Sequence, residues 1–269
     1  MKKRVLIVTN ELRPYVELSD VAEAISNLPG YLNTQGYEIR ILMPRFGTIN
    51  ERRHRLHEVV RLSGMNIIMD DEDFPLIIKV ASLPNSRLQV YFLDNEEFFK
   101  RKNIFSDDAE RFHDDNAERM VFFCKGVCET VKKFGWAPDI IHCNGWMTSL
   151  VPVYARTVYK DEPVFENAKL IYSLYNTSFD GKLGANFLKK AKIAGDINEK
   201  DLKPLEGRDF VSLSLGGAHF SDAIIMGSKN IDKSINDKYK TKNGKAVLKF
   251  NDKEDYLLEY LELYKKLHK

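Results

Sequence analysis

The segment 139–147, which reads DIIHCNGWM, holds the side chains best placed to bind a ligand. Its apolar residues have the pattern of a strand, and that strand ends in a polar turn containing Gly145. In an open parallel α/β sheet, ligands bind in the crevice beyond the carboxyl ends of the strands. Asn144, Gly145 and Trp146 are therefore candidate binding residues. Aromatic rings such as Trp146 pack in cores and at rims, and they also stack on flat ligands.

The elements that must position this turn alternate between strands and helices. A strand at 4–9, a helix at 19–32 capped by Ser19 or Asp20, and a strand at 37–44 predict a right-handed βαβ unit with a parallel sheet. Short apolar runs between 56 and 93 predict antiparallel hairpins. The later elements are expected at 115–134 (helix), 140–142 (strand), 147–159 (helix), 170–174 (strand), from Gly184 (helix), 210–220 (helix) and 223–226 (strand). This pattern predicts a single Rossmann-like, doubly wound and mainly parallel α/β sheet.

The end of the chain differs in composition from the rest. Residues 231–252 are rich in Lys, Asn and Asp, which indicates a surface connection between a domain at 1–230 and the segment 253–269. That last segment places an apolar stripe on one side of a helix. The stripe predicts a C-terminal helix that packs back on the domain.

Bulk composition excludes some classes of partner. The chain has 269 residues, and its 41 Lys+Arg against 39 Asp+Glu give a formal charge of +2, too even to indicate nucleic acid or a membrane surface. No run approaches the roughly 18 apolar residues of a membrane span. Cys124, Cys128 and Cys143 have no framework spacing, which favours a reducing cytoplasm and buried thiols over a metal site. We expect no metal and no cofactor.

Several segments, in collinear order, resemble the glycogen/starch synthases, the ADP-glucose-dependent glucosyltransferases of the GT-B fold. Residues 139–152 keep the frame of the family's Pro-Asp-Ile-Val-His-x-His-Asp-Trp-His-Thr-x-Leu-Val-Pro. The other similar stretches lie at 36–47, 90–101, 115–123, 175–181 and 215–222. The resemblance covers most of residues 3–230 and implies the N-terminal half of a GT-B enzyme. It also implies a substrate-binding role for Trp146, Tyr175, Asn176, Gly216 and Gly217.

The chain departs from this family where the family binds its nucleotide. The resemblance aligns the family's Lys-Thr-Gly-Gly-Leu-Ala-Asp with ELSDVAE at 17–23. It implies that the family's Lys meets the diphosphate and that its glycines let the helix N-terminus approach. Glu17 puts a negative charge in place of that positive one, and Asp20 adds a second carboxylate. The repulsion between two like charges at ~4 Å, such as a carboxylate and a phosphate, costs on the order of 1–4 kcal/mol. Both acids would also favour the positive end of the following helix, and either role opposes diphosphate binding.

Further departures concern the sugar contacts and the second domain. Asn144 and Gly145 replace a His and an Asp of the family frame, and Met147 replaces another His. The resemblance implies a second Rossmann-like domain after residue ~230 that carries most nucleotide-sugar contacts, and nothing after Gly227 resembles it. We hypothesise that 253–269 is the family's terminal helix, which crosses back to the N-terminal domain.

Three functions are consistent with these residues. The first is a catalytically degenerate domain that binds ADP-glucose, another sugar or an α-glucan, or that regulates a full-length synthase. The second is an active glucosyltransferase that transfers from ADP-glucose to α-1,4-glucan. The third is a half-enzyme completed in trans by a separate C-terminal domain, for which an exposed apolar face or self-association is the expected sign. The aromatic residues that would stack on sugars in any of these are Tyr15, Trp146, Tyr175 and Phe179.

Overall fold

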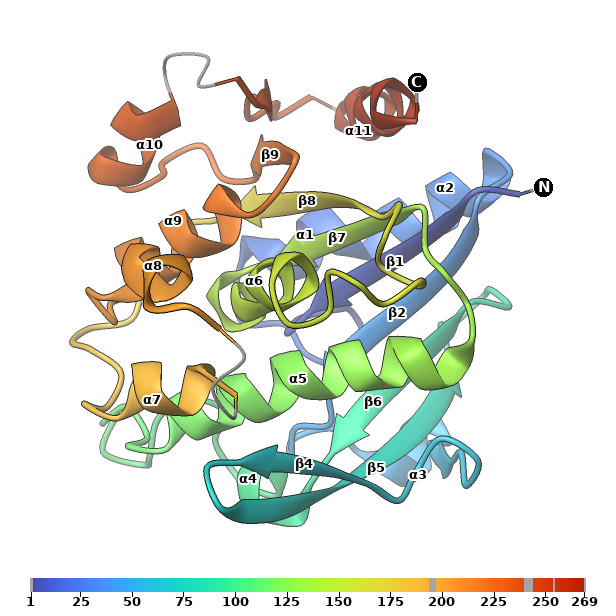
Figure 1. Ribbon diagram of the computed structural model, residues 1–269. Helices are drawn as coiled ribbons and strands as arrows, with labels where there is room; N and C mark the ends of the chain where they lie inside the picture. Colours follow the sequence, from blue (N-terminus) through green and yellow to red (C-terminus); the bar gives the residue numbers. More distant parts are fainter. Residues whose placement is uncertain (1, 194–196, 240–243, 254, 269) are drawn as a thin grey trace.

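The computed structural model describes residues 2–193, 197–239, 244–253 and 255–268. Its strands are β1 (Arg4–Thr9), β2 (Glu38–Pro44), β3 (His57–Glu58), β4 (Met65–Met69), β5 (Glu72–Ser82), β6 (Gln89–Asp94), β7 (Ile140–Asn144), β8 (Lys169–Leu174), β9 (Ala223–Met226) and β10 (Ala246–Leu248). They form one sheet in the order β10-β9-β8-β7-β1-β2-β6-β5-β3, with β4 attached to β5 (Figure 1).

The central part of the sheet is parallel. Each neighbouring pair from β10 to β6 runs in the same direction, and Ile7 on β1 lies between Ile41 on β2 and His142 on β7. The strands β1 and β7 are buried almost throughout because helices cover both faces of the sheet. The mainly parallel, doubly wound α/β fold is thereby confirmed.

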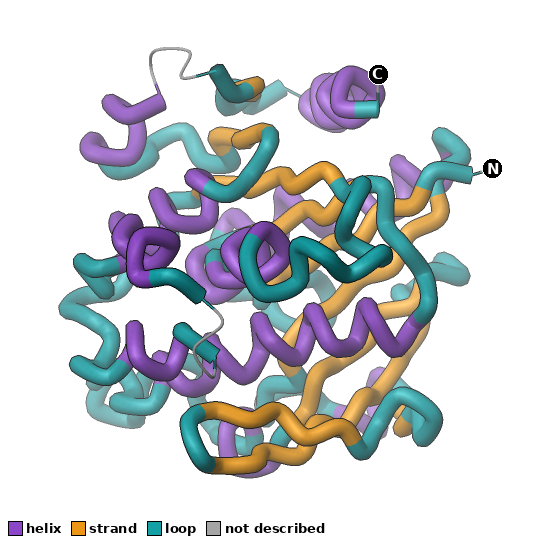
Figure 2. The backbone as a smooth tube through the Cα atoms, in the orientation of Figure 1, coloured by secondary structure: helices purple, strands orange, loops and turns teal. Residues whose placement is uncertain are grey.

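The hairpins expected between 56 and 93 form the antiparallel edge. β5 pairs antiparallel with β3, β4 and β6, and the β4–β5 hairpin extends away from the main sheet (Figure 2). The apolar run at 59–62 was expected to belong to a strand, but it lies in a turn after β3. Leu62 is nevertheless fully buried, whereas Val60 is 79% exposed, so only part of the run packs into the core.

Helices lie on both faces. On one face are α1 (Asp20–Ser26), α2 (Leu28–Thr34) and α11 (Tyr256–Leu267), and on the other are α5 (Asn116–Phe134), α6 (Leu150–Arg156) and α9 (Phe210–His219) (Figure 1). Shorter helices are α3 (Glu51–His54), α4 (Glu96–Phe99), α7 (Phe187–Ala191), α8 (Glu199–Leu202) and α10 (Lys233–Tyr239), with 3-10 turns η1 (Trp146–Thr148) and η2 (Lys203–Leu205).

Two predicted helices are each split in the structure. The helix expected at 19–32 becomes α1 and α2, because Pro29 occupies the first turn of α2 and cannot continue the hydrogen bonding of α1. Ser19 caps α1, accepting a hydrogen bond from the Val21 amide. The helix expected at 147–159 becomes η1 followed by α6, which ends at Arg156.

The tail is more structured than a surface connection. The interval 231–252 contains α10 and β10, and β10 adds a parallel strand beside β9. The helix α11 then buries Tyr260, Leu261, Leu263 and Tyr264 against the domain. Full burial of a large apolar side chain contributes roughly 1.5–3 kcal/mol, so α11 is held firmly in place.

Candidate functional site

A cavity of about 510 Å³ opens beyond the carboxyl ends of β1, β7 and β8. We call it the aromatic cavity, because rings form much of its wall. The aromatic residues that line it are Phe105, Phe112, Trp146 and Phe179. The polar residues that line it are Asn10, Glu11, Ser19, Ser106, Glu110, Asn176, Thr177, Ser178 and Asp180. The predicted residues Trp146 and Asn176 thus meet in one cavity, and Phe179, expected to stack on sugars, joins them.

The rings of this wall pack on one another. The Trp146 ring centroid lies 5.1 Å from that of Phe105 and 4.9 Å from that of Phe179. Phe112 and Phe179 stack with 4.6 Å between centroids and 8° between planes. Trp146 is 4% exposed, so little of its ring reaches the cavity, whereas Phe179 is half-buried. The wall therefore offers apolar faces held by mutual contact.

Gly145 sets the position of Trp146. Its φ of 80° is a conformation that favours glycine, and a Cβ atom there would come within 2.8 Å of Asn10 Oδ1. Its carbonyl oxygen accepts hydrogen bonds from Tyr172 and Thr148. The turn is thus tied to β8 and η1, and it directs Trp146 toward the cavity wall.

Asn144 and Tyr175 lie inside the sheet, beneath the cavity floor. The Tyr175 hydroxyl donates to Asn144 Oδ1 at 3.2 Å, and the Asn144 amide donates to the carbonyl oxygens of Val8 and His142. Both residues are at most 2% exposed. Their polar atoms are used within the protein, so they support the crevice without lining either cavity described here.

Two predicted glycines and one aromatic residue lie elsewhere. Gly216 and Gly217 are in α9, where added Cβ atoms would approach Leu205 to 2.3 Å and Tyr172 to 2.6 Å. They allow α9 to pack closely on η2 and β8. Tyr15 packs against Phe92 and donates to the Ser82 carbonyl oxygen. None of these three lines the aromatic cavity in the described part of the chain.

Glu11, which lines the aromatic cavity, is a site residue that the sequence pattern does not predict. This carboxylate accepts hydrogen bonds from the amides of Leu18 and Ser19, at 2.8 and 2.7 Å, and from the Ser19 hydroxyl at 2.9 Å. Glu11 is 2% exposed. Burial raises its pKa, while the amides and the Ser19 hydroxyl oppose that rise. The Glu11 carboxyl group therefore already accepts the hydrogen bonds of the Leu18 and Ser19 backbone amides, which precede α1.

Glu17 and Asp20 flank these amides on the surface. Glu17 is exposed and pairs with Arg13, whose hydrogen bond holds the Glu17 pKa below its ordinary value. Asp20 accepts a hydrogen bond from the Ser228 hydroxyl, and that hydroxyl accepts one from the backbone N–H of Asn176. Ser228 follows the strand predicted at 223–226. A polar residue just beyond the carboxyl end of a strand is a sequence signal that could have identified Ser228 as a site residue.

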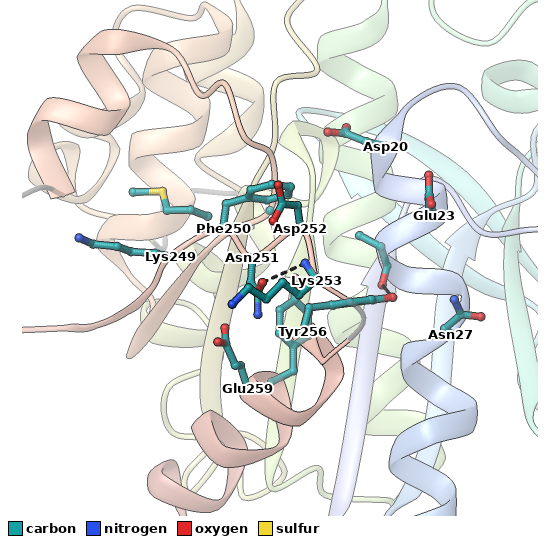
Figure 3. Close-up of a pocket in the computed structure, with 14 residues that line it drawn as sticks. Asp20, Glu23, Asn27, Lys249, Phe250, Asn251, Asp252, Lys253, Tyr256 and Glu259 are labelled. Carbon is teal, nitrogen blue, oxygen red and sulfur yellow. Dashed lines mark hydrogen bonds between the residues drawn. The ribbon is translucent and has the colours of Figure 1, made fainter.

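A second cavity, of about 420 Å³, lies between α1 and the tail. We call it the acidic cavity. Figure 3 shows Asp20, Glu23 and Asn27 on one side and the segment from Lys249 to Glu259 on the other. Its carboxylates are Asp20, Glu23, Asp252 and Glu259, its cations are Lys249 and Lys253, and its aromatic rings are Phe250, Tyr256 and Tyr260.

His142, the histidine of the motif, belongs to the core. Its Nδ1 atom lies 2.6 Å from the Tyr264 hydroxyl and its Nε2 atom lies 2.6 Å from the Ser173 hydroxyl. Burial lowers its pKa to about 3, so the ring is neutral near pH 7. It joins β7 to α11 and is remote from solvent.

The described residues also bear on metal clusters and membrane-spanning helices. Those residues contain no group of three or more His, Cys, Asp or Glu side chains able to hold a metal ion. Across the same ranges, no helix has the length and apolar character needed to cross a membrane.

Comparison with known proteins agrees with this architecture. The starch synthase catalytic domain family matches residues 4–250. The glycogen synthase of Chlorobaculum parvum is 38% identical over 233 residues, which is 86% of this chain and 47% of that protein. The glycogen synthase of Chlorobium luteolum is 40% identical over 192 residues, covering 70% of this chain and 38% of that protein. The chain thus spans about half the length of the curated relatives it matches.

A solved structure gives the same result for the fold. The catalytic domain of starch synthase IV from Arabidopsis thaliana, bound to ADP and acarbose, superposes with a TM-score of 0.69 at 18% sequence identity. The match covers 84% of this chain and 45% of that one.

Proposed function

We propose that this chain, which belongs to the starch synthase catalytic domain family, is a sugar- or α-glucan-binding domain of α-glucan metabolism that does not transfer glucose from ADP-glucose on its own. In this proposal the aromatic cavity is the sugar site, and the domain regulates a partner such as a full-length synthase. Its three buried free cysteines are consistent with a cytoplasmic location.

The observation that carries the proposal is the lining of the aromatic cavity. It combines half-buried rings such as Phe179 with exposed neutral groups such as Asn176 and Ser178. Sugar rings present apolar faces and hydroxyl edges, which match that combination of stacking surfaces and hydrogen-bonding groups. The related starch synthase IV structure holds acarbose, a sugar-like ligand, which supports the same ligand class here.

The charges around the cavity argue against a nucleoside diphosphate. None of the described residues that line the aromatic cavity is Lys, Arg or His. The amides before α1 are bonded to Glu11, and Glu17, Asp20 and Glu23 add exposed carboxylates nearby. Transfer from a nucleotide sugar needs cations or dipoles that stabilise the departing diphosphate. We therefore expect ADP and ADP-glucose to bind no tighter than millimolar.

The division of the chain is part of this proposal. We assign 1–230 to the family's N-terminal domain and 253–269 to the helix that packs back on it. The hydrogen bond between His142 and Tyr264 and the burial of Leu261 support that assignment. Within 231–252, the strand β10 (Ala246–Leu248) pairs with β9 and so belongs to the same sheet.

An active glucosyltransferase, alone or completed in trans by a separate C-terminal domain, is the alternative. It is favoured by Trp146 and Asn176, which keep the family's residues in the cavity. In that case ADP-glucose would bind in the micromolar range, or glucosyl transfer to glycogen would be detected.

Calorimetry on the purified chain separates these functions. Maltooligosaccharides, ADP and ADP-glucose are titrated in turn. We expect measurable maltooligosaccharide binding that weakens about fivefold in Phe179→Ala, because the ring contributes about 1 kcal/mol of stacking. Phe250→Ala is the matched control, since Phe250 lines the acidic cavity and is 38% exposed. Loss of sugar binding in Phe250→Ala but not in Phe179→Ala would contradict the assignment.

A further inference from the structure

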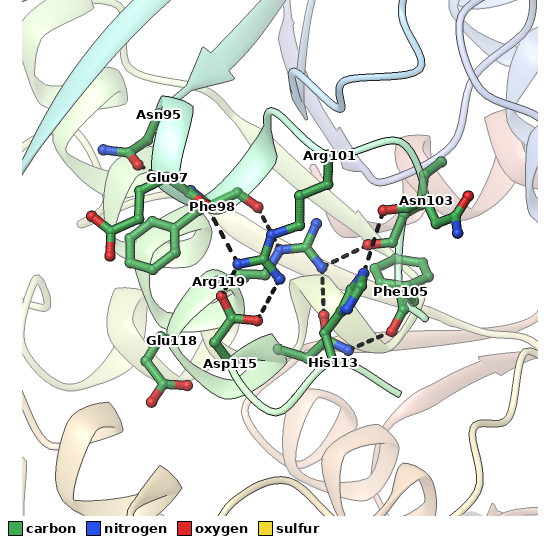
Figure 4. Close-up of polar contacts among 12 residues, drawn as sticks. Asn95, Glu97, Phe98, Arg101, Asn103, Phe105, His113, Asp115, Glu118 and Arg119 are labelled. Atoms are coloured by element: carbon green, nitrogen blue, oxygen red, sulfur yellow. Dashed lines mark hydrogen bonds and ion pairs between the residues drawn. The ribbon is translucent and has the colours of Figure 1, made fainter. Parts of the chain in front are cut away.

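Arg119 is fully buried in α5, beside the loop that leads to the aromatic cavity. Its guanidinium group donates to the carbonyl oxygen of Phe98 at 2.7 Å, to that of Ile104 at 2.6 Å, and to the side-chain oxygen of Asn116 (Figure 4). Its Nη2 atom is buried without a hydrogen-bond partner. The bond to Ile104 reaches the loop between α4 and α5, whereas Phe98 lies in α4 and Asn116 in α5 itself.

The positive charge of Arg119 is not neutralised by direct contact. Within the described part of the chain, the neighbouring carboxylate of Asp115 is paired instead with Arg101. The rings of Phe46 and Phe99 lie 5.8 and 5.5 Å from the guanidinium carbon. Burial lowers the pKa of Arg119 to about 10. A buried cation without a carboxylate is costly, and an apolar side chain would fill the space without that cost.

The bonded loop forms one wall of the aromatic cavity. Residues 100–115 connect α4 to α5 and contribute Phe105 and Phe112 to the wall. The Asn116 amide donates to the Phe105 carbonyl oxygen at 2.8 Å, directly beside the Ile104 carbonyl held by Arg119. The Phe105 ring in turn contacts Trp146. A continuous series of contacts therefore runs from the guanidinium to the ring.

We propose that Arg119, with Asn116, is a positioning residue that fixes the loop 100–115 so that Phe105 and Phe112 close the aromatic cavity against Trp146. The sugar-binding part of this inference rests on the proposed function. The part that concerns the wall does not, because it follows from the contacts alone. Arg119 acts through the loop and does not itself line the cavity.

The identity of residue 116 is consistent with this role. Asn116 accepts a hydrogen bond from Arg119 through its oxygen and donates one to Phe105 through its nitrogen. An aspartate would supply the missing negative charge but would lose the donor to Phe105. In Asn116→Asp the charge of Arg119 gains a carboxylate partner, but the side-chain hydrogen bond that attaches the loop at Phe105 is lost. The variant therefore tests attachment of the loop separately from compensation of the charge.

The test uses Trp146 as an internal probe. The chain contains two tryptophans, so a Trp136→Phe background leaves Trp146 as the only one. In that background, acrylamide quenching of Trp146 fluorescence and calorimetric affinity for maltoheptaose are measured for Arg119→Lys and Asn116→Asp. Arg156→Lys is the control for an Arg-to-backbone bond away from this cavity, because Arg156 donates to the Ala168 carbonyl oxygen; unlike Arg119, it is part-buried and also pairs with Asp222.

We expect Trp146 to become severalfold more accessible to acrylamide in both test variants and to remain protected in Arg156→Lys. Maltoheptaose affinity should fall about tenfold in parallel. Unchanged quenching in Asn116→Asp, with the fold intact by circular dichroism, would overturn the proposal, and this variant decides the matter if Arg119→Lys does not fold. If the background chain binds no maltoheptaose, the proposed function fails, while the quenching result still decides whether Arg119 and Asn116 position the wall.

Discussion

The aromatic cavity and the acidic cavity flank the β1–α1 segment, yet their walls differ in composition. The aromatic cavity is bounded by rings, neutral polar groups and the carboxylates of Glu11, Glu110 and Asp180. The acidic cavity is bounded by α1 on one side and the tail on the other, with carboxylates on both sides. The rings of the first suit a neutral sugar, and neither wall favours a phosphate, because the first carries three carboxylates and no cation in its described lining and the second carries four carboxylates against two lysines.

In the proposed function, the family scaffold keeps one half of a site and loses the other. Trp146 and Asn176, the side chains that would face a sugar, match the residues of the family that the sequence resembles. Glu17 and Asp20, at the positions that would face a diphosphate, carry negative charge instead. Loss of the cation at residue 17 leaves the strands and their turns unaffected because Glu17 is exposed.

The largest expected effect comes from loosening the tail, which lines only the acidic cavity. Tyr264→Ala should lower the free energy of unfolding by about 3–5 kcal/mol, because the side chain is fully buried. Urea denaturation measures this loss. In the folded fraction, maltooligosaccharide affinity should stay the same, and a parallel loss would show that the two cavities are not independent. Tyr264→Phe, which removes only the hydroxyl bonded to His142, should cost about 1–3 kcal/mol.

A second effect depends on pH and again concerns the tail. The pKa of His142 falls from 6.5 in the unfolded chain to about 3 in the folded protein, because burial disfavours its charged form. Between pH 6.5 and pH 3 the His142 side chain is protonated in the unfolded chain and neutral in the folded protein, so acid favours unfolding. The contribution of His142 to stability is therefore complete above pH 6.5 and is lost as the pH falls toward 3. Between pH 7 and pH 5 the loss is about 2 kcal/mol.

Replacing the histidine isolates that effect. Urea denaturation of His142→Gln at pH 7 and pH 5 should show a smaller loss on acidification than the parent protein. An equal loss in both proteins would assign the acid sensitivity to carboxylates instead.

A third, smaller effect sharpens the comparison at the phosphate positions. The double variant Glu17→Lys/Asp20→Gly should bind ADP about tenfold more tightly, roughly 1.4 kcal/mol, since it removes repulsion and adds a cation beside a helix N-terminus. Calorimetry measures the gain, and Glu97→Lys reproduces the charge reversal of the Glu17→Lys component away from the site, because Glu97 is exposed on α4. Glucosyl transfer should stay absent, and its appearance would favour the active-enzyme alternative.

The smallest effect is the response to salt. Raising the ionic strength from about 0.01 to 1 M shortens the screening length from about 30 to 3 Å. Maltooligosaccharide affinity should change less than about twofold, because the ligand is neutral. The ADP affinity gained by the double variant should shrink with added salt. Strong salt dependence of sugar binding would indicate that charged groups dominate the aromatic cavity.

The sequence predicted the strands well because their buried apolar runs are local and continuous. The strand at 4–9 and the long helix ending at Phe134 were found at their observed positions. The break between α1 and α2 was missed, because the apolar spacing continues past Pro29. The three-residue strand β10 was missed because Ala246–Leu248 is only half-buried and too short to show alternation.

The candidate site was predicted less completely because loops form much of it. Trp146, Asn176 and Phe179 come from recognisable turns after strands and do line the aromatic cavity. Phe105 and Phe112 come from a loop that is bonded to Asn116 and Arg119 through the carbonyl oxygens of Phe105 and Ile104, contacts that no local pattern reveals. The role of Glu11 was also hidden, since a carboxylate directly after a strand does not by itself indicate which amides it will accept.

The docking of α11 also has a consequence for the order of folding. Tyr256 donates to the carbonyl oxygen of Ala24, 232 positions earlier in the chain. Closing so long a loop costs entropy before any contact repays it, so α11 should join after the sheet has formed. Substitutions in α11 should then accelerate unfolding and leave the refolding rate nearly unchanged. We therefore expect the docking of α11 to slow unfolding and so to lengthen the lifetime of the native state.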